Sequence, residues 1–93
     1  MAEKTLSFNK NGNKYVAETT VNADYNLHIE TEGKMSVSIF QRGSDQGKYR
    51  RCYVEHKWDE VLDADFRHAV YPKYIRIEVD KEVTKATVRE AEE

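Results

Sequence analysis

The fold class is decided by residues 25–40, which read YNLHIETEGKMSVSIF. Two runs of alternating apolar and polar side chains lie here on either side of a short turn. The apolar positions of the two runs are Tyr25, Leu27, Ile29, Met35, Val37 and Ile39. A period of two is typical of a strand with one buried face. A three-residue loop over 31–33, with Gly33 left-handed, would make the runs a hairpin that pairs Ile29 with Met35.

The same alternation recurs along most of the chain. The dipeptide Asn11-Gly12 favours a two-residue type I′ turn, which would set Phe8 opposite Tyr15. Further strands are expected over 49–57 and 75–79, and 58–72 is interpreted as a loop with one short helical turn. The predicted core comprises Leu6, Phe8, Tyr15, Leu27, Ile29, Val37, Ile39, Cys52, Val54, Ile75, Ile77 and Val79.

These segments predict an all-β domain of seven or eight short strands with at most one short helical turn. Such strands pack as two sheets or curl into a barrel, and we expect a small antiparallel β-sandwich of jelly-roll type. A chain of 93 residues allows one core. We therefore predict a single domain over 1–93, with a frayed tail at 89–93.

Composition limits the class of protein. The formal net charge is −2, with 15 basic and 17 acidic side chains. Residues 42–57 carry a local net charge of +3 and the last sixteen residues one of −3, so a nucleic-acid partner is not expected and a protein partner or self-association is. No apolar run is long enough for a membrane span. The given chain also lacks the apolar region of a signal peptide, which favours a cytoplasmic or virion-associated protein.

Signatures of cofactor and metal sites are weak. The four glycines lie at 12, 33, 43 and 47, so neither a dinucleotide-binding motif nor a phosphate-binding loop can be written, and no cofactor is expected. Cys52 is the only cysteine, which argues against a zinc site. Asp63 and Asp65, with the nearby Asp59 and Glu60, are calcium candidates, because hard cations bind clustered carboxylates. The alternative is a solvated acidic loop.

One group of side chains suggests a ligand. In a regular strand over 49–57, Tyr49, Arg51 and Tyr53 share one face, while Cys52 and Val54 share the other. An exposed face of this kind would offer two flat rings and a planar guanidinium to a sugar or a base. Alternatively, both tyrosines belong to the core.

Three more aromatic side chains lie near the irregular segment and are expected in a pocket wall or at the core edge. They are Trp58, Tyr71 and Tyr74.

Residues 71–77, which read YPKYIRI, resemble part of a known family of β-sandwich modules. An aromatic residue followed by an apolar-Arg-apolar strand resembles the last part of galactose-binding-like jelly-roll modules. Small sandwiches of this kind also look like accessory proteins of phages and gut bacteria. The resemblance implies a glycan held at loops or on an exposed sheet face, and it implies no catalytic residue.

Three functions are therefore considered. The first is a non-catalytic interaction or structural module, such as a surface or virion accessory domain. The second is a carbohydrate-binding module that uses Tyr49, Arg51 and Tyr53, with Tyr71 and Tyr74 nearby. The third is a hydrolase whose carboxylates cannot be identified from sequence. We expect the protein not to be an enzyme.

Overall fold

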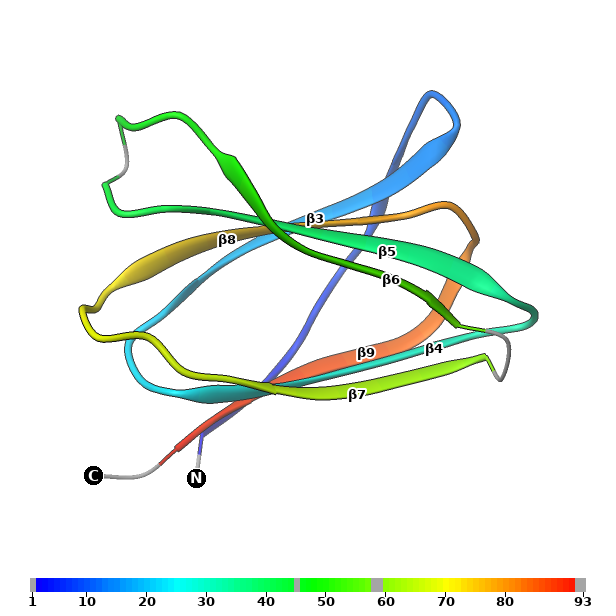
Figure 1. The fold of residues 1–93 in the computed structure, drawn as a ribbon. Coiled ribbons are helices and arrows are strands. Elements are labelled where there is room, and N and C mark those ends of the chain that lie inside the picture. Colours follow the sequence, from blue (N-terminus) through cyan, green and yellow to red (C-terminus); the bar gives the residue numbers. More distant parts are fainter. Residues whose placement is uncertain (1, 45, 58–59, 92–93) are drawn as a thin grey trace.

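Two antiparallel sheets face each other in the computed structural model, which describes residues 2–44, 46–57 and 60–91 (Figure 1). The strands in these residues are β1 (Ala2–Thr5), β2 (Asn9–Asn11), β3 (Lys14–Val21), β4 (Tyr25–Thr31), β5 (Met35–Arg42), β6 (Arg50–Lys57), β7 (Val61–Phe66), β8 (Lys73–Val79) and β9 (Val83–Glu90). The four-stranded sheet has the order β1-β9-β4-β7 and the five-stranded sheet the order β2-β3-β8-β5-β6. The prediction of an all-β sandwich is confirmed. The described strands number nine rather than seven or eight, because the N-terminal segment is divided between the two sheets and because 61–66 forms a strand.

The core lies between the sheets and follows the alternation in the sequence. The predicted core residues that are buried are Leu27, Ile29, Val37, Ile39, Ile75, Ile77 and Val79. Further buried apolar residues are Ala17, Val21, Tyr25, Met35, Leu62, Ala86 and Val88. Leu6, Phe8 and Tyr15 are only half-buried, because they lie near the edge formed by β1 and β2.

The first hairpin has a different register from the predicted one. Asn11 is paired with Lys14, and Lys10 rather than Phe8 lies opposite Tyr15. The two-residue loop is therefore Gly12-Asn13. Gly12 has a φ of 65°, and no positive φ is found at Asn13. A positive φ at the first loop position alone is typical of a type II′ turn, whereas the expected type I′ turn needs it at both.

The predicted hairpin over 25–40 is wrong. Strand β4 belongs to the four-stranded sheet and β5 to the five-stranded sheet, so Ile29 and Met35 are not paired. The connection over 32–34 crosses from one sheet to the other, and Gly33 has no positive φ. Alternation correctly identified the buried face of each strand. It could not distinguish pairing within one sheet from packing across the core, because both arrangements bury the same residues.

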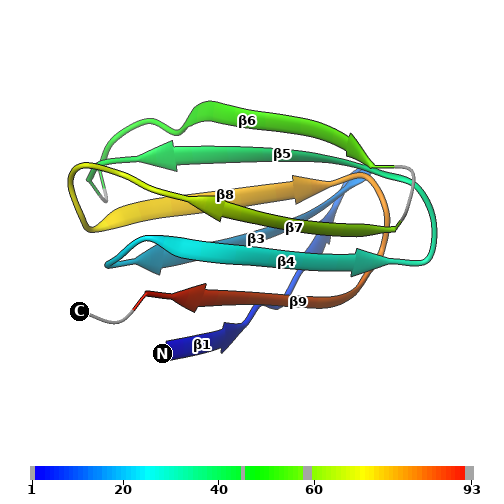
Figure 2. The same cartoon turned by 60° about the horizontal axis from the view of Figure 1, so that its bottom comes forward.

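Most strands pair with partners that are distant in sequence. Strand β5 pairs with β6, β4 with β7, β3 with β8, and β1 with β9, each pair enclosing the previous one along the chain. Figure 2 shows β6 and β7 along the same side of the sandwich. The segments 22–24, 43–44, 46–49 and 67–72 gather at the left end of Figure 1, together with both ends of the chain. We call this the terminal end.

The segment after β6 is mainly extended. Strand β7 occupies 61–66 where a loop with a helical turn was expected, and no helix occurs in the described residues. Trp58 and Asp59 lie outside the described residues. Arg89 and Glu90, assigned to the frayed tail, instead pair in β9 with β4 and β1. No helix in the described chain is long and apolar enough to cross a membrane.

Candidate functional site

A β-bulge in β6 separates the side chains that were predicted to share one face. Strand β5 pairs Ile39 with Tyr53 and Phe40 with Arg51, so Cys52 is an extra residue without an opposite partner. Directly opposed residues of neighbouring strands point to the same side of the sheet. Tyr53 therefore points inward with buried Ile39, whereas Arg51 points outward with Phe40. The continuous Tyr49-Arg51-Tyr53 face does not form.

The bulge also corrects the two core assignments in β6. Val54 is 48% exposed and Cys52 is exposed. The Cys52 thiol donates a hydrogen bond to the Ile39 carbonyl oxygen, at 3.4 Å between S and O. Tyr53 occupies the inward position instead and packs against the core cluster. The sequence contains no glycine that would have marked this bulge.

The inward-pointing tyrosine joins a group of rings at the terminal end. Tyr53 packs edge-on against Phe66, with ring centroids 5.1 Å apart. Phe66 stacks on Tyr25 at 5.2 Å, and Tyr25 stacks on His68 at 5.9 Å. His68 meets Tyr71 edge-on at 5.9 Å. Tyr53 and Tyr71 therefore belong to one aromatic cluster, which closes the end of the core rather than presenting an open platform.

A hydrogen-bonded group fixes the segment 67–72 to the start of β4. The Tyr71 hydroxyl donates to Asp24 Oδ1 at 2.5 Å, and the His68 backbone N–H donates to the Tyr71 oxygen at 3.0 Å. The hydrogen bond from Tyr71 is the main reason that the pKa of Asp24 is lowered. Burial lowers the pKa of His68, helped by the charge of Lys73, and the buried His68 Nε2 has no partner in the described residues.

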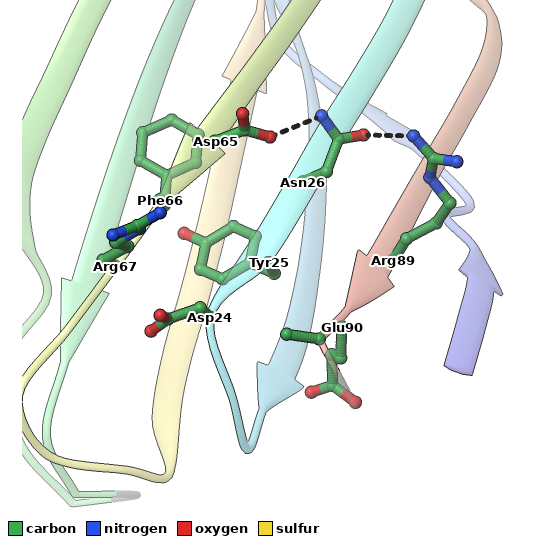
Figure 3. Close-up of a pocket in the computed structure, with 9 residues that line it drawn as sticks. Asp24, Tyr25, Asn26, Asp65, Phe66, Arg67, Arg89 and Glu90 are labelled. Carbon is green, nitrogen blue, oxygen red and sulfur yellow. Dashed lines mark hydrogen bonds between the residues drawn. The ribbon is translucent and has the colours of Figure 1, made fainter. Parts of the chain in front are cut away.

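A shallow pocket of about 350 Å³ lies beside this cluster (Figure 3). Asn26 stands at its rim, where its amide nitrogen donates to Asp65 at 2.9 Å and its oxygen accepts from Arg89 at 3.3 Å. The carboxylates of Asp24, Asp65 and Glu90 point in different directions in Figure 3. Each already accepts a hydrogen bond from within the chain. Convergent carboxylates, which hydrolysis of a glycoside requires, are not formed by these three groups.

The calcium candidates lie on the outer face of β7. Asn26 Nδ2 donates to Asp63 at 2.5 Å and to Asp65 at 2.9 Å. The hydrogen bond from Asn26 is the main cause of the lowered pKa of Asp63. An amide donor thus occupies the position between the carboxylates that a cation would need. No metal-binding group of three acidic, His or Cys side chains occurs in the described residues.

A second surface forms on the outer face of the five-stranded sheet. Neighbouring strands place Arg76, Phe40 and Arg51 side by side in one row. The next row pairs Tyr74 with Arg42, and the Arg42 guanidinium carbon lies 4.4 Å from the Tyr49 ring centroid and 5.7 Å from that of Tyr74. We call this surface the aromatic–arginine patch. Its members are Phe40, Arg42, Tyr49, Arg51, Tyr74 and Arg76.

The three arginines of the patch differ in their surroundings. Arg76 Nε donates to Glu78 at 3.1 Å, and Arg76 Nη1 lies 3.6 Å from a carboxylate oxygen of Glu18. Arg42 Nη1 donates to the Gly47 carbonyl oxygen at 3.2 Å, and the rings of Tyr49 and Tyr74 flank its guanidinium. Arg51 is exposed and forms no ion pair with the described part of the chain. Burial raises the pKa of the Tyr49 hydroxyl. The three arginines outnumber the two neighbouring carboxylates of Glu18 and Glu78, so one positive charge is left over.

Three of the five predicted ligand-binding residues lie in the patch: Tyr49, Arg51 and Tyr74. Sequence reasoning missed Phe40, Arg42 and Arg76. Phe40 and Arg42 on β5, and Arg76 on β8, alternate with the buried residues of their strands. The alternation in the sequence therefore indicated that these three side chains lie on the outer face. Only the strand order β8-β5-β6 could show that these positions are neighbours.

A Ser–His contact occurs at the other end of the same outer face. Ser36 Oγ lies 2.6 Å from His56 Nδ1. A nucleophile and base of this kind need a third group that orients the imidazole. The nearby Asp80 instead accepts a hydrogen bond from the Ser36 backbone N–H at 2.7 Å. The contact is therefore a cross-strand polar pair without an orienting carboxylate among the residues described.

Comparison with known protein families, curated proteins and solved structures gives no match. Functional inference for this chain therefore rests on the geometry of its surfaces.

Proposed function

We propose that this chain is a non-catalytic protein-interaction module and that the aromatic–arginine patch is its binding surface. The observation that carries the proposal is the ordering of the patch, in which arginine and aromatic side chains alternate over neighbouring strands. Tyrosine and arginine are enriched among the residues that dominate binding energy at protein interfaces. Acidic residues, which are depleted there, occur only at the border of the patch, where Glu18 and Glu78 pair with Arg76.

The structure of the patch also fits an interface that is ready to bind. Phe40, Arg42, Tyr49 and Tyr74 are half-buried, so their side chains are already partly ordered by neighbours. Ordering a free side chain on binding costs roughly 0.5–1.5 kcal/mol. Held on strands and flanked by stacked rings, Arg42 avoids most of that cost. A sheet face is also a firmer support than a loop.

We further infer that the sandwich is of jelly-roll type. With β2 set aside, the pairs β1·β9, β3·β8, β4·β7 and β5·β6 are nested, as in a long hairpin of eight strands that is rolled into two sheets. This arrangement supports the resemblance to galactose-binding-like modules at the level of fold. Fold alone does not define function.

Carbohydrate binding is the second candidate, because Tyr49, Arg51 and Tyr74 were predicted for it and lie together in the patch. Sugar rings bind to open aromatic faces. Arg42 covers one face each of Tyr49 and Tyr74, and Tyr53 points into the core. These contacts favour a protein partner over a glycan.

The proposal is tested by cross-linking capture in lysate of the source organism. Three baits are compared: the natural chain, the double variant Phe40→Ser/Arg51→Glu, and the matched control Lys85→Glu, which changes an exposed charge on the opposite sheet. A partner that is lost with the patch variant and kept with the control supports the proposal. A partner captured equally by all three baits contradicts it. Amide chemical shifts in titrations with pooled oligosaccharides test the carbohydrate alternative.

A further inference from the structure

We infer that the patch recognises a carboxylate-bearing surface of a protein partner, in which acidic side chains flank an apolar group. This inference rests on the proposed function and specifies the chemistry of the partner. It follows from the charge of the patch, from the exposure of Arg51 and from the position of Phe40 between two arginines.

The charge of the patch is positive and only partly neutralised. Its six members include three arginines and no acidic residue, and the acidic neighbours Glu18 and Glu78 both contact Arg76. Arg51, which is exposed, forms no ion pair with any described residue. Arg42 is held between two rings, which fixes the plane of its guanidinium. The Nε of Arg42 is buried, so the guanidinium that is free to present its fork to the two oxygens of a carboxylate is that of Arg51.

The row across three strands sets the spacing that a partner must match. Arg76, Phe40 and Arg51 are neighbours on β8, β5 and β6, and adjacent strands lie about 4.8 Å apart. The two arginine backbones are therefore about 10 Å apart, with the phenylalanine midway. Arg76 already has carboxylate neighbours, and Arg42 has a buried Nε and an Nη1 that donates to Gly47. The exposed Arg51 is therefore the group most available to a new acid. An apolar side chain of the partner would cover Phe40.

Ligands that bind by stacking fit the patch less well. A base or a sugar ring stacks on an open aromatic face, and the guanidinium of Arg42 covers one face each of Tyr49 and Tyr74, which reduces the ring area open to stacking. A nucleic-acid strand presents a negative charge about every 3.4 Å along its axis. The carboxylates of Glu18 and Glu78 beside Arg76 would repel such a dense row of phosphates. A protein surface can place its few acids beside the exposed Arg51 and away from these two carboxylates.

The test uses a random copolymer of glutamate and tyrosine as the probe, which supplies carboxylates together with apolar rings. Amide chemical shifts of the isotope-labelled chain are followed during titration with this copolymer, with polyglutamate, with polygalacturonate and with oligo-dT. We expect saturable shifts centred on Phe40, Arg42, Arg51, Tyr74 and Arg76. The copolymer should bind more tightly than polyglutamate, because only the copolymer covers Phe40. Binding should weaken with salt, since exposed charges are screened.

Variants separate a specific carboxylate contact from general attraction. Arg51→Gln should weaken copolymer binding by about tenfold, since a charge-assisted hydrogen bond contributes about 1.5 kcal/mol. Arg51→Lys keeps the charge but loses the planar guanidinium, so its affinity for the copolymer should lie between those of the natural chain and Arg51→Gln. Lys85→Gln on the opposite sheet should bind like the natural chain.

Each other outcome overturns the inference in a distinct way. Stronger binding of oligo-dT or polygalacturonate at the patch would leave a binding surface but replace its ligand class. Equal loss for Arg51→Gln and Lys85→Gln would show non-specific attraction. Shifts on both sheet faces that appear on concentrating the chain alone would identify a second copy as the occupant. If none of the four probes changed the amide chemical shifts of the patch, the inference would be rejected. The capture experiment would still test the proposed function independently.

Discussion

Substitutions at the bulge in β6 test whether the faces of this strand are assigned correctly. In the structure Tyr53 points into the core and packs edge-on against Phe66, with ring centroids 5.1 Å apart. Val54, the next residue, is 48% exposed. A regular strand would reverse these roles. Tyr53→Ala and Val54→Ala therefore distinguish the bulged from the regular arrangement.

The expected effects differ severalfold. Full burial of a tyrosine side chain removes roughly 150–250 Å² from water, and about half of that at about 25 cal/mol per Å² is worth about 2–3 kcal/mol. The edge-on contact with Phe66 adds about 0.5–1.5 kcal/mol. We expect Tyr53→Ala to lower the free energy of unfolding by about 3 kcal/mol. Val54→Ala should change it by no more than about 0.5 kcal/mol, as is usual for an exposed site.

Denaturant unfolding and thermal melts measure both changes. For a domain of this size a loss of about 1 kcal/mol lowers Tm by about 4–8 °C, so Tyr53→Ala should melt at least about 10 °C lower. Tyr53→Phe is the control, because it keeps the ring and removes only the hydroxyl that contacts Glu55. If Val54→Ala were as destabilising as Tyr53→Ala, the inward position of Tyr53 and the split of the predicted face would be refuted.

Two further predictions concern pH and backbone conformation. His68 has a folded-state pKa below its ordinary value of 6.5 because of burial, so the unfolded state binds its proton first and stability is lost as pH falls below about 6.5. The free energy of unfolding measured at about pH 7.5 and about pH 5 should show this loss, and His68→Gln should reduce it. If the free energy of unfolding of His68→Gln changed with pH as much as that of the natural chain, the burial of His68 would be contradicted. Gly12 has a φ of 65°, so Gly12→Ala should destabilise the chain by about 1 kcal/mol, since other residues are strained there. Gly43 has no positive φ, and a methyl group added to it would meet no atom within 4 Å, so a Gly43→Ala variant that lost as much in the same melts would show that the turn conformation is not the cause.

Local patterns predicted the class of fold and much of the core. Leu27, Ile29, Val37 and Ile39 are buried because alternation states which side of each strand is apolar. The same pattern does not indicate which strands pair with each other. Strand β4 pairs with β7 and β9, far along the chain, rather than with β5 across the short connection. A turn of three residues is compatible with a hairpin and with a crossing between sheets alike.

The predicted site was divided for a related reason. One extra residue, Cys52, reverses the faces of β6 on either side of it, so Arg51 and Tyr53 point in opposite directions. Alternation within a strand assumes a regular ladder, and a bulge without glycine leaves no mark in the sequence. Tyr49 was found through the alternation over 49–57, and Tyr74 as an aromatic residue near the irregular segment. Their common neighbour Arg42 was not, because its role depends on the lateral order of three strands.

The bulge lets one edge strand, β6, contribute side chains both to the core and to the patch. Inward-pointing Tyr53 helps to close the terminal end of the core through Phe66, while Arg51, before the bulge, extends the patch that begins on β8 and β5. A regular strand would place both side chains on one face, so that either the core would lose a ring or the patch would lose a guanidinium. Bulges also interrupt the edge hydrogen-bond ladder and so disfavour pairing of β6 with another chain. Binding through the outer face of the five-stranded sheet is therefore more consistent with this edge than association by strand addition.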